Sequence, residues 1–275
     1  MEFSGTFLPT TASSGLLACF TWYTMVATMF FLLASTVFSW LTRTHVAPEH
    51  NTNRVLTACI SVVAGVSYFL IQDYFRTFLH AANGVPTYTE NYAAFLAIGQ
   101  LRYMDWTITT PLLLIKMFMM VHATDLRGSR LLYWAIVADI FMIATGYIGD
   151  QQLAVDGSIL VGPRLIWGAI STIGYLFIVY ALYRVWQEYA PLAKPIERRA
   201  FRLMAGTVVT LWGVYPIGYI FIAVTSINAD YLQIAYSVAD VLNKVGVGII
   251  VYLAGSNILE ERIDVTSPEY AMSVG

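Results

Sequence analysis

Charged residues are scarce in this chain of 275 residues. They make up 12% of it, hydrophobic residues make up 58%, and the mean hydropathy is +0.65. A water-soluble domain has about twice that share of charge, because charged side chains cover its surface. The composition therefore excludes a soluble globular protein and a disordered one. The formal net charge of −2 also gives no basic surface for nucleic acid, so no such partner is expected.

Cysteine is nearly absent as well. The chain has two, Cys19 and Cys59, both inside apolar stretches, so neither a disulfide framework nor a cysteine metal site is expected. The four histidines lie near the ends of apolar runs, where an interfacial side chain is the simplest interpretation: His45, His50, His80 and His122. We therefore expect no metal site. The segment before the first apolar run has no Lys or Arg, which argues against a cleaved signal peptide.

Long apolar runs dominate the rest of the sequence. A run of about 20 apolar residues spans the roughly 30 Å hydrocarbon core of a bilayer. Such runs lie at about 15–41, 55–79, 96–121, 130–150, 162–186, 201–226 and 231–256. The connections are short, apart from two segments around 80–95 and 187–200. These features predict an all-α, multi-pass protein of the cell membrane, with residues 1–275 forming one seven-transmembrane-helix bundle in contact with the lipid bilayer.

Lysine and arginine are distributed unevenly over the connections. Ten of the fifteen would lie on one side of the membrane: Arg43, Arg54, Arg127, Arg130, Arg184, Lys194, Arg198, Arg199, Arg202 and Arg262. The other side would have Arg76 and Arg164. Because positive residues accumulate in cytoplasmic connections, we expect the N-terminus outside and the C-terminus in the cytoplasm.

Six charged residues fall inside the predicted spans: Arg102, Asp105, Lys116, Asp139, Asp240 and Lys244. A charge in mid-membrane costs at least about 2.5–3.5 kcal/mol on insertion scales, so each one is a candidate functional residue. Snorkelling of a cation, or capping of a neighbouring helix by an aspartate, would explain one of them, such as Asp139. It does not easily explain six residues on three helices.

Helical spacing places several of these side chains on common faces. Asp105 and Thr109 share one stripe of the third span, and Lys116 lies three turns beyond Asp105, about 16 Å along the axis. In the last span Asp240 and Lys244 are four residues apart and also share a face. The result is a polar line across an apolar bundle, as a proton relay requires.

Lys244 is followed by Val245, Gly246 and further apolar residues, and no headgroup lies within its reach. Two interpretations stay open. A free ammonium at this depth would need a carboxylate beside it. Alternatively the amine is used covalently, since a desolvated lysine forms Schiff bases readily. A protonated Schiff base between Asp105 and Asp240 would restore the charge balance.

Three motifs, in order along the chain, resemble the microbial (type 1) rhodopsins. The third span reads RYMDWTITTPLLL over 102–114, and the seventh reads ADVLNKVG over 239–246. Between them, the sixth reads WGVYP over 212–216, followed by Tyr219. The resemblance covers nearly the whole chain, and it is to bacterial proton-pump-like members such as proteorhodopsin, xanthorhodopsin and the Exiguobacterium rhodopsin.

The resemblance implies all-trans retinal bound covalently to Lys244 as a protonated Schiff base. Asp105 would be the counterion and proton acceptor, Asp240 the second counterion, and Arg102 the extracellular gate. The implied cofactor-binding residues are Tyr103, Trp106, Thr110, Leu113, Asp139, Met142, Gly146, Ser171, Trp212, Tyr215, Pro216 and Tyr219. Ordinary helix packing is the alternative explanation for the aromatic residues among them. Asp139 would be a neutral, structural acid that hydrogen-bonds Thr110.

In the family, three positions of the third span are compared: the proton acceptor, an intermediate position and the proton donor. In this chain they would be Asp105, Thr109 and Lys116. Aspartate and threonine at the first two resemble outward proton pumps, whereas chloride and sodium pumps carry other residues there. Lysine departs from the usual carboxylate donor. It would take up a proton from the cytoplasm only transiently, which leaves the speed of reprotonation open.

Several further positions compare with the family. Leucine at Leu113 accompanies green absorption, and Leu70 falls where many proteorhodopsin-like pumps have a histidine. Asp73 and Asp230 are the nearby acids that could replace missing proton-release glutamates. Gly168 lies where a glycine opens a window for a carotenoid antenna in xanthorhodopsin-like proteins, although glycine also packs membrane helices.

The resemblance therefore predicts a light-driven outward proton pump, which is not an enzyme. Retinal would isomerise from all-trans to 13-cis, Asp105 would receive the proton, and Lys116 would conduct its replacement from the cytoplasm. The alternative is a slow-cycling sensory photoreceptor with a transducer as its partner, which the lysine donor and the missing histidine both allow. Family members are often trimers or pentamers, so a homo-oligomer is expected.

Overall fold

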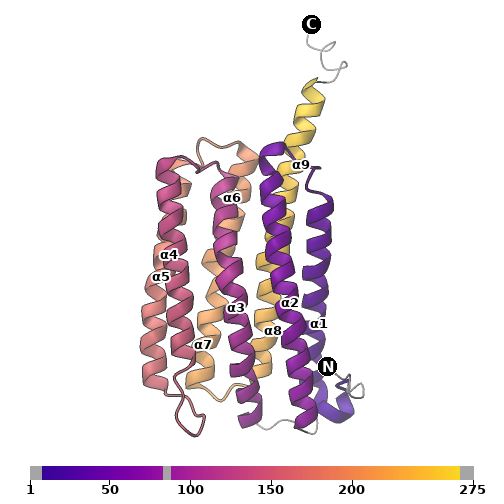
Figure 1. The fold of residues 1–275 in the computed structure, drawn as a ribbon, viewed down its shortest axis with the longest axis vertical. Helices are drawn as coiled ribbons and strands as arrows, with labels where there is room; N and C mark the ends of the chain where they lie inside the picture. The colour runs from indigo at the N-terminus through magenta and orange to yellow at the C-terminus, as the bar shows by residue number, and fades with distance from the viewer. Residues whose placement is uncertain (1–7, 83–87, 267–275) are drawn as a thin grey trace.

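Helices form the spans because a backbone N–H or C=O in lipid must bond within its own segment. The computed structural model describes residues 8–82 and 88–266, which form an antiparallel seven-span bundle (Figure 1). The first five spans are α1 (Thr11–Leu41), α2 (Asn51–Ala81), α3 (Tyr88–Met120), α4 (Leu126–Asp150) and α5 (Val161–Glu188). The predicted fold is confirmed.

The sixth and seventh spans are each interrupted near the middle. The sixth consists of α6 (Pro195–Thr210), the 3-10 turn η2 (Leu211–Gly213) and α7 (Val214–Val224). The seventh consists of α8 (Ala229–Asp240), the π-helical segment η3 (Val241–Gly246) and α9 (Val247–Thr266), and a 3-10 turn η1 (Pro48–His50) precedes α2. Pro216 explains the first interruption, because it has no N–H and its ring crowds the carbonyl of Trp212. The π-helical turn contains Lys244, and such widened turns are frequent at functional sites.

Three of the predicted helix ends were wrong. α3 begins at Tyr88, α6 begins at Pro195, and α9 continues to Thr266, beyond the end of the bundle (Figure 1). The two long connections are correspondingly shorter than predicted. Proline at the first helical position and the Glu197 side chain, which accepts from the backbone N–H of Lys194 at 2.9 Å, start α6 before its apolar run. The prediction from hydropathy placed each helix end at the edge of its apolar run, whereas these helices continue past that edge.

The outer surface of the bundle is apolar, unlike the surface of a soluble protein. Large apolar side chains cover the outside of the bundle, among them Leu16, Phe30, Trp134, Ile166 and Leu176. Of the spans in the described part of the chain, six are long and apolar enough to cross a membrane. α3 is the remaining one, and it lies between α2 and α4 in the bundle (Figure 1). The buried charges of α3 lower its hydropathy, but it is packed between two helices that are themselves apolar enough to span the membrane.

Two arginines that were assigned to the membrane surfaces lie inside the bundle instead. Arg54, one turn into α2, is fully buried and donates to the carbonyl of Gly248 at 3.0 Å and to Thr42 Oγ1 at 2.6 Å. Arg164, at the start of α5, is also fully buried.

The remaining cations are still concentrated where α1 ends and α6 begins, which we call the arginine-rich end. The start of α1 and the end of α9 lie at opposite ends of the bundle (Figure 1), and the membrane orientation stays a prediction.

Helices α4 and α5 pack closely because Gly174 lacks a side chain. A Cβ there would lie 2.6 Å from the carbonyl oxygen of Ala138 and 3.1 Å from the backbone nitrogen of Met142. Backbone atoms cannot rotate away, so any side chain at this position would separate the two helices.

We expect Gly174→Ala to lower the free energy of unfolding by about 1–3 kcal/mol through overpacking. Gly206→Ala is the matched control, since a Cβ at that helical glycine meets nothing within 4 Å. It should be neutral or raise stability by up to about 1 kcal/mol. Thermal denaturation of both variants in the same detergent measures the difference, and equal midpoints would contradict the packing argument.

Candidate functional site

Lys244 lies at the centre of a buried ionic group. Its Nζ donates to Asp105 Oδ2 at 2.6 Å and to Asp240 Oδ1 at 3.0 Å. All three side chains are almost completely buried. α3 supplies Asp105, and the last turn of α8 and η3 supply the other two. The ammonium and two carboxylates thus connect the third and seventh spans, as the sequence spacing predicted.

Asp240 is surrounded by donors. The hydroxyl of Tyr215 donates to Oδ1 at 2.7 Å and the hydroxyl of Tyr68 donates to Oδ2 at 2.8 Å. Arg102 Nη1 donates to the Tyr68 hydroxyl at 2.7 Å and lies 3.4 Å from Asp240 Oδ2, while its Nη2 donates to Gln233 Oε1 at 2.9 Å. Sequence reasoning missed Tyr68 and Gln233. Neither residue is charged, and a charge inside an apolar run was the signal that identified the other members of this group.

Asp105 has a less complete set of contacts. Among the described residues, its Oδ1 has no hydrogen-bond partner, although it is buried. The hydroxyl of Thr109 donates to the main-chain carbonyl of Asp105 at 3.0 Å. The two cations, Lys244 and Arg102, balance the two aspartates in charge, which a buried group needs. Of the two carboxylates, Asp105 therefore accepts fewer hydrogen bonds from described side chains.

An apolar cavity of about 310 Å³ adjoins Lys244. It extends between α3, α4, α5 and the sixth span. The residues around it that had been predicted are Tyr103, Trp106, Thr109, Thr110, Leu113, Met142, Gly146, Gly168, Ser171, Trp212, Tyr215, Pro216, Tyr219, Asp240 and Lys244. The volume and the largely apolar walls fit an elongated hydrophobic ligand with one reactive end at the lysine.

Five lining residues were not predicted: Ile60, Ile143, Thr172, Tyr175 and Asn243. Asn243 precedes Lys244, and both its amide atoms are buried without a partner among the described residues. Asp139 does not line the cavity, but Thr110 Oγ1 lies 2.7 Å from its Oδ2, as expected, and also donates to the Trp106 carbonyl at 2.8 Å. Because the hydroxyl has one proton, both bonds form when Asp139 is protonated and donates to Thr110.

Lys116 is separate from this ionic group. It is 1% exposed, and its Nζ donates to Thr57 Oγ1 on α2 at 2.9 Å. No carboxylate pairs with it in the part of the chain that the structure describes. Thr57 in turn donates to the carbonyl of Asn53 at 2.8 Å, toward the arginine-rich end.

Arg164 and Asp150 form a second buried ion pair beside the cavity, with 2.6 Å between Nη2 and Oδ1. The guanidinium lies 4.2 Å from the ring centroid of Tyr219, whose hydroxyl donates to the Arg164 carbonyl at 2.7 Å. Tyr219 lines the cavity, so this ion pair fixes part of its wall. The sequence assigned Arg164 to the membrane surface and so did not predict this role.

Three predicted neighbours of the site lie elsewhere or have other contacts. Leu70 is 45% exposed on the outside of the bundle, so its assignment beside Asp105 was wrong. Ser67 is buried on the α3 side instead, and its hydroxyl donates to the Leu101 carbonyl at 3.3 Å. Asp73 pairs with Arg76 on an exposed face. Asp230 is 3% exposed and accepts from Asn91 at 3.1 Å.

We expect Arg164→Met to destabilise the protein by about 3–5 kcal/mol, because Asp150 would remain buried without its cation. The double variant Asp150→Leu/Arg164→Met should recover most of that loss. Arg76→Met breaks a partly exposed pair with Asp73 and should cost no more than about 1 kcal/mol. Thermal unfolding of the variants measures these differences, and a double variant as unstable as Arg164→Met would contradict them.

Comparison with known proteins gives one consistent result. A family model described as bacteriorhodopsin-like protein matches residues 19–257. The green-light absorbing proteorhodopsin of gamma-proteobacterium EBAC31A08 is 28% identical over 227 residues, which is 80% of either chain. The crystal structure of Exiguobacterium sibiricum rhodopsin has a TM-score of 0.72 and 26% identity, covering 86% of this chain and 96% of that one. Xanthorhodopsin, described as a light-driven ion pump with dual chromophore, has a TM-score of 0.75 and 25% identity, covering 91% and 97%.

Proposed function

Because the chain belongs to the bacteriorhodopsin-like protein family, we propose that it is a light-driven outward proton pump with retinal bound covalently to Lys244. One observation carries the proposal: the Lys244 amine lies between two buried carboxylates and next to an apolar cavity. A protein that only binds a hydrophobic ligand would not need this ionic group. The proteorhodopsin and xanthorhodopsin relatives support the same function.

The residues around the cavity fit retinal, which is an aldehyde on a long conjugated hydrocarbon. The Lys244 amine is the group that condenses with an aldehyde, and it adjoins the cavity directly. Trp106, Trp212 and Tyr215 supply rigid aromatic walls, as a flat conjugated chain requires. Bound there, retinal would supply the absorption of light and an isomerisation that disturbs the balance of charges around the lysine nitrogen.

Asp105 is the proton acceptor in this proposal. Its Oδ2 lies 2.6 Å from the Lys244 nitrogen, within direct transfer distance, and its Oδ1 has no partner among the described residues. Both oxygens of Asp240 already accept from tyrosine hydroxyls, so Asp240 acts as a fixed counterion. Arg102, which bonds Tyr68 and Gln233, separates the group from the end of the bundle where α3 begins. Release takes place past Arg102, toward that end.

Reprotonation comes from the arginine-rich end through Lys116. The lysine lies eleven residues beyond Asp105 on α3, about 16 Å along the helix. Lys116 is buried without a carboxylate partner among the described residues, which supports its role as a residue that carries a proton only briefly. The concentration of cations at this end supports its assignment to the cytoplasm, which makes the direction of transport outward.

Two finer proposals concern other molecules. Gly168 lines the cavity from α5, and its position supports an accessory carotenoid beside retinal. The solved xanthorhodopsin, described as having a dual chromophore, is the relative that motivates this idea. Assembly into trimers or pentamers stays a prediction.

The pump is tested with retinal-fed cells that express the protein, by recording the pH of the suspension under light. We expect external acidification that a protonophore abolishes. Asp105→Asn should lower its initial rate about 100-fold or more, since proton transfer loses its acceptor. Asp73→Asn is the matched control, because that aspartate lies on an exposed face, and it should pump like the wild type.

Other outcomes are informative. A coloured wild-type protein that changes no pH would contradict the pump and favour the sensory photoreceptor. Alkalinisation would reverse the assigned orientation.

The role of Lys116 is tested by flash photolysis at neutral pH. Lys116→Ala should slow the last, proton-uptake phase of the photocycle about 100-fold, because the buried donor is lost. Thr57→Val keeps the lysine but removes the hydroxyl that holds it, so it should slow the same phase less. Lys194→Ala, at the exposed start of α6, should leave the phase unchanged. Equal rates for Lys116→Ala and wild type would show that the lysine does not carry the proton.

A further inference from the structure

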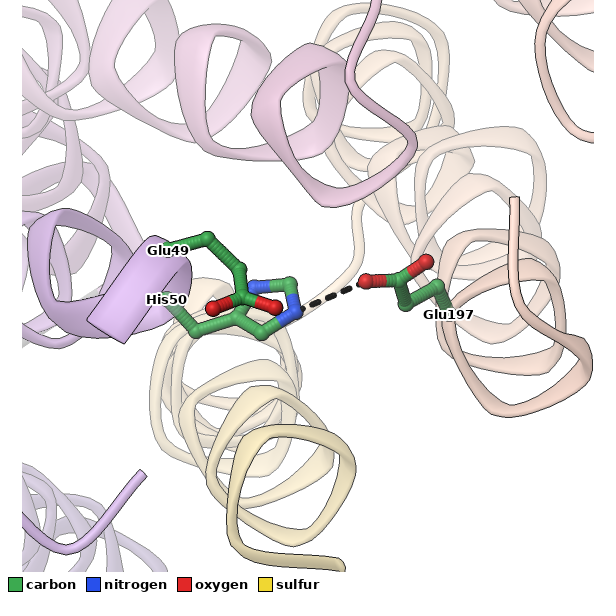
Figure 2. A group of neighbouring side chains, drawn as sticks. All are labelled: Glu49, His50 and Glu197. Carbon is green, nitrogen blue, oxygen red and sulfur yellow. Dashed lines mark hydrogen bonds and ion pairs between the residues drawn. The ribbon is translucent and has the colours of Figure 1, made fainter. Parts of the chain in front are cut away.

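Two histidines and a glutamate meet at the arginine-rich end, outside the site described above. Glu197, in the first turn of α6, lies with its Oε1 3.0 Å from Nε2 of His50 and 3.0 Å from Nε2 of His122. His50 is at the end of η1 and points across to Glu197, with the Glu49 carboxylate beside its ring (Figure 2). His122 lies in the connection between α3 and α4. Three segments that are far apart in the sequence therefore converge on one carboxylate oxygen.

Burial sets this cluster apart from a surface hydrogen-bond network. The side chains of His50 and Glu197 are 0% and 2% exposed, whereas that of His122 is 50% exposed. The expectation that His50 is an interfacial side chain was therefore wrong. Its ring is enclosed, and the half-exposed His122 leaves one open side through which a small ion can reach the carboxylate.

The buried amide of Asn53 is compatible with a proton on either nitrogen of His50. Its Nδ2 lies 3.4 Å from His50 Nδ1, and its Oδ1 is buried without a partner among the described residues. Amide oxygen and nitrogen are interchangeable by a rotation of 180°. After that rotation Oδ1 accepts from Nδ1–H of His50, whereas without it Nδ2 donates to Nδ1 and the Nε2–H of His50 donates to Glu197. His50 Nε2 then faces Glu197 Oε1 at 3.0 Å, and either a proton on Nε2 or a metal ion must lie between these two atoms.

The backbone of His122 is strained in the direction that serves this contact. Its φ is 55°, in the left-handed region that non-glycine residues rarely adopt. Such a conformation costs of order 1–3 kcal/mol and persists where surrounding contacts require it. Here it directs the imidazole of His122 at Glu197.

The spacing of the ligand atoms fits a small divalent ion. Zinc binds histidine nitrogen and carboxylate oxygen at about 2.0–2.2 Å in a tetrahedron, whose edges are then roughly 3.3 Å long. The two His–Glu distances of 3.0 Å are hydrogen-bond lengths, and each would lengthen slightly to become such an edge. One ligand atom each from Glu49, His50 and Glu197 lies within 4.8 Å of the other two. His122 is not part of this compact group, so its ring and Glu49, whose present partner is Arg262, would both have to move to complete the site.

We propose that Glu49, His50, His122 and Glu197 form a binding site for one divalent transition-metal ion of the zinc class. Two imidazoles and two carboxylates are a ligand set that such ions prefer, whereas calcium and magnesium prefer oxygen alone. The ion joins the start of α2, the α3–α4 connection and the start of α6. The site does not depend on retinal or on the direction of proton transport.

The test is titration of tag-free, retinal-bound protein in detergent with Zn²⁺ by isothermal calorimetry, and with Mg²⁺ in parallel. We expect one Zn²⁺ per chain, no saturable binding of Mg²⁺, and a higher midpoint of thermal unfolding with Zn²⁺. His122→Ala and Glu49→Gln should each weaken binding at least about tenfold, as the loss of a direct ligand does. Both variants alter partly exposed side chains, and the visible absorption band checks that each is folded.

His45→Ala is the matched control, because that histidine is exposed at the same end, five residues before His50. It should bind Zn²⁺ like the wild type. Unchanged affinity in His122→Ala and Glu49→Gln would overturn the proposal, and so would the absence of saturable Zn²⁺ binding to the wild type. In that case the cluster is an imidazolium–carboxylate pair that satisfies buried polar groups without a metal.

Discussion

The whole bundle depends on one positive charge held in an apolar interior. Lys244 has no solvent to stabilise its ammonium, so the protein places Asp105 and Asp240 on either side of it. Those carboxylates then need their own donors, which Tyr68, Tyr215 and Arg102 supply to Asp240. Each buried polar group is thus stabilised by another buried polar group. These hydrogen bonds and ion pairs connect the second, third, sixth and seventh spans. The ionic group holds the helices together and, in the proposed function, also holds the proton that is moved.

The sequence predicted much of this, because charge in an apolar run is a strong signal. The spans, the ionic group and most of the cavity wall followed from hydropathy, from helical spacing and from the family resemblance. Residues without an unusual local signal were missed. Tyr68 and Asn243 look like ordinary members of their helices until a neighbouring span brings Asp240 or the cavity beside them. Arg54 and Arg164 sit near helix ends, where sequence alone cannot distinguish a snorkelling cation from a buried one.

The histidine cluster shows the same limit more sharply. His50, His122 and Glu197 follow no ligand spacing, since 72 and 75 residues separate them in turn. Only the antiparallel arrangement, which brings the start of α2, the end of α3 and the start of α6 to one end of the bundle, puts them together. Long-range convergence of this kind is set by topology, and no periodicity in one segment predicts it.

The low hydropathy of α3 has a consequence for how the protein is made. Asp105 precedes Lys244 by 139 residues in the chain, so it is synthesised long before its eventual cation. Arg102, one turn away on the same helix, is the opposite charge available to it at that stage, and α1 and α2 are already present to pack against it. Asp105 of the third span therefore depends on a residue of the seventh span for its final ion pair. The ionic group can form only once the seventh span is present, because that span supplies both Lys244 and Asp240.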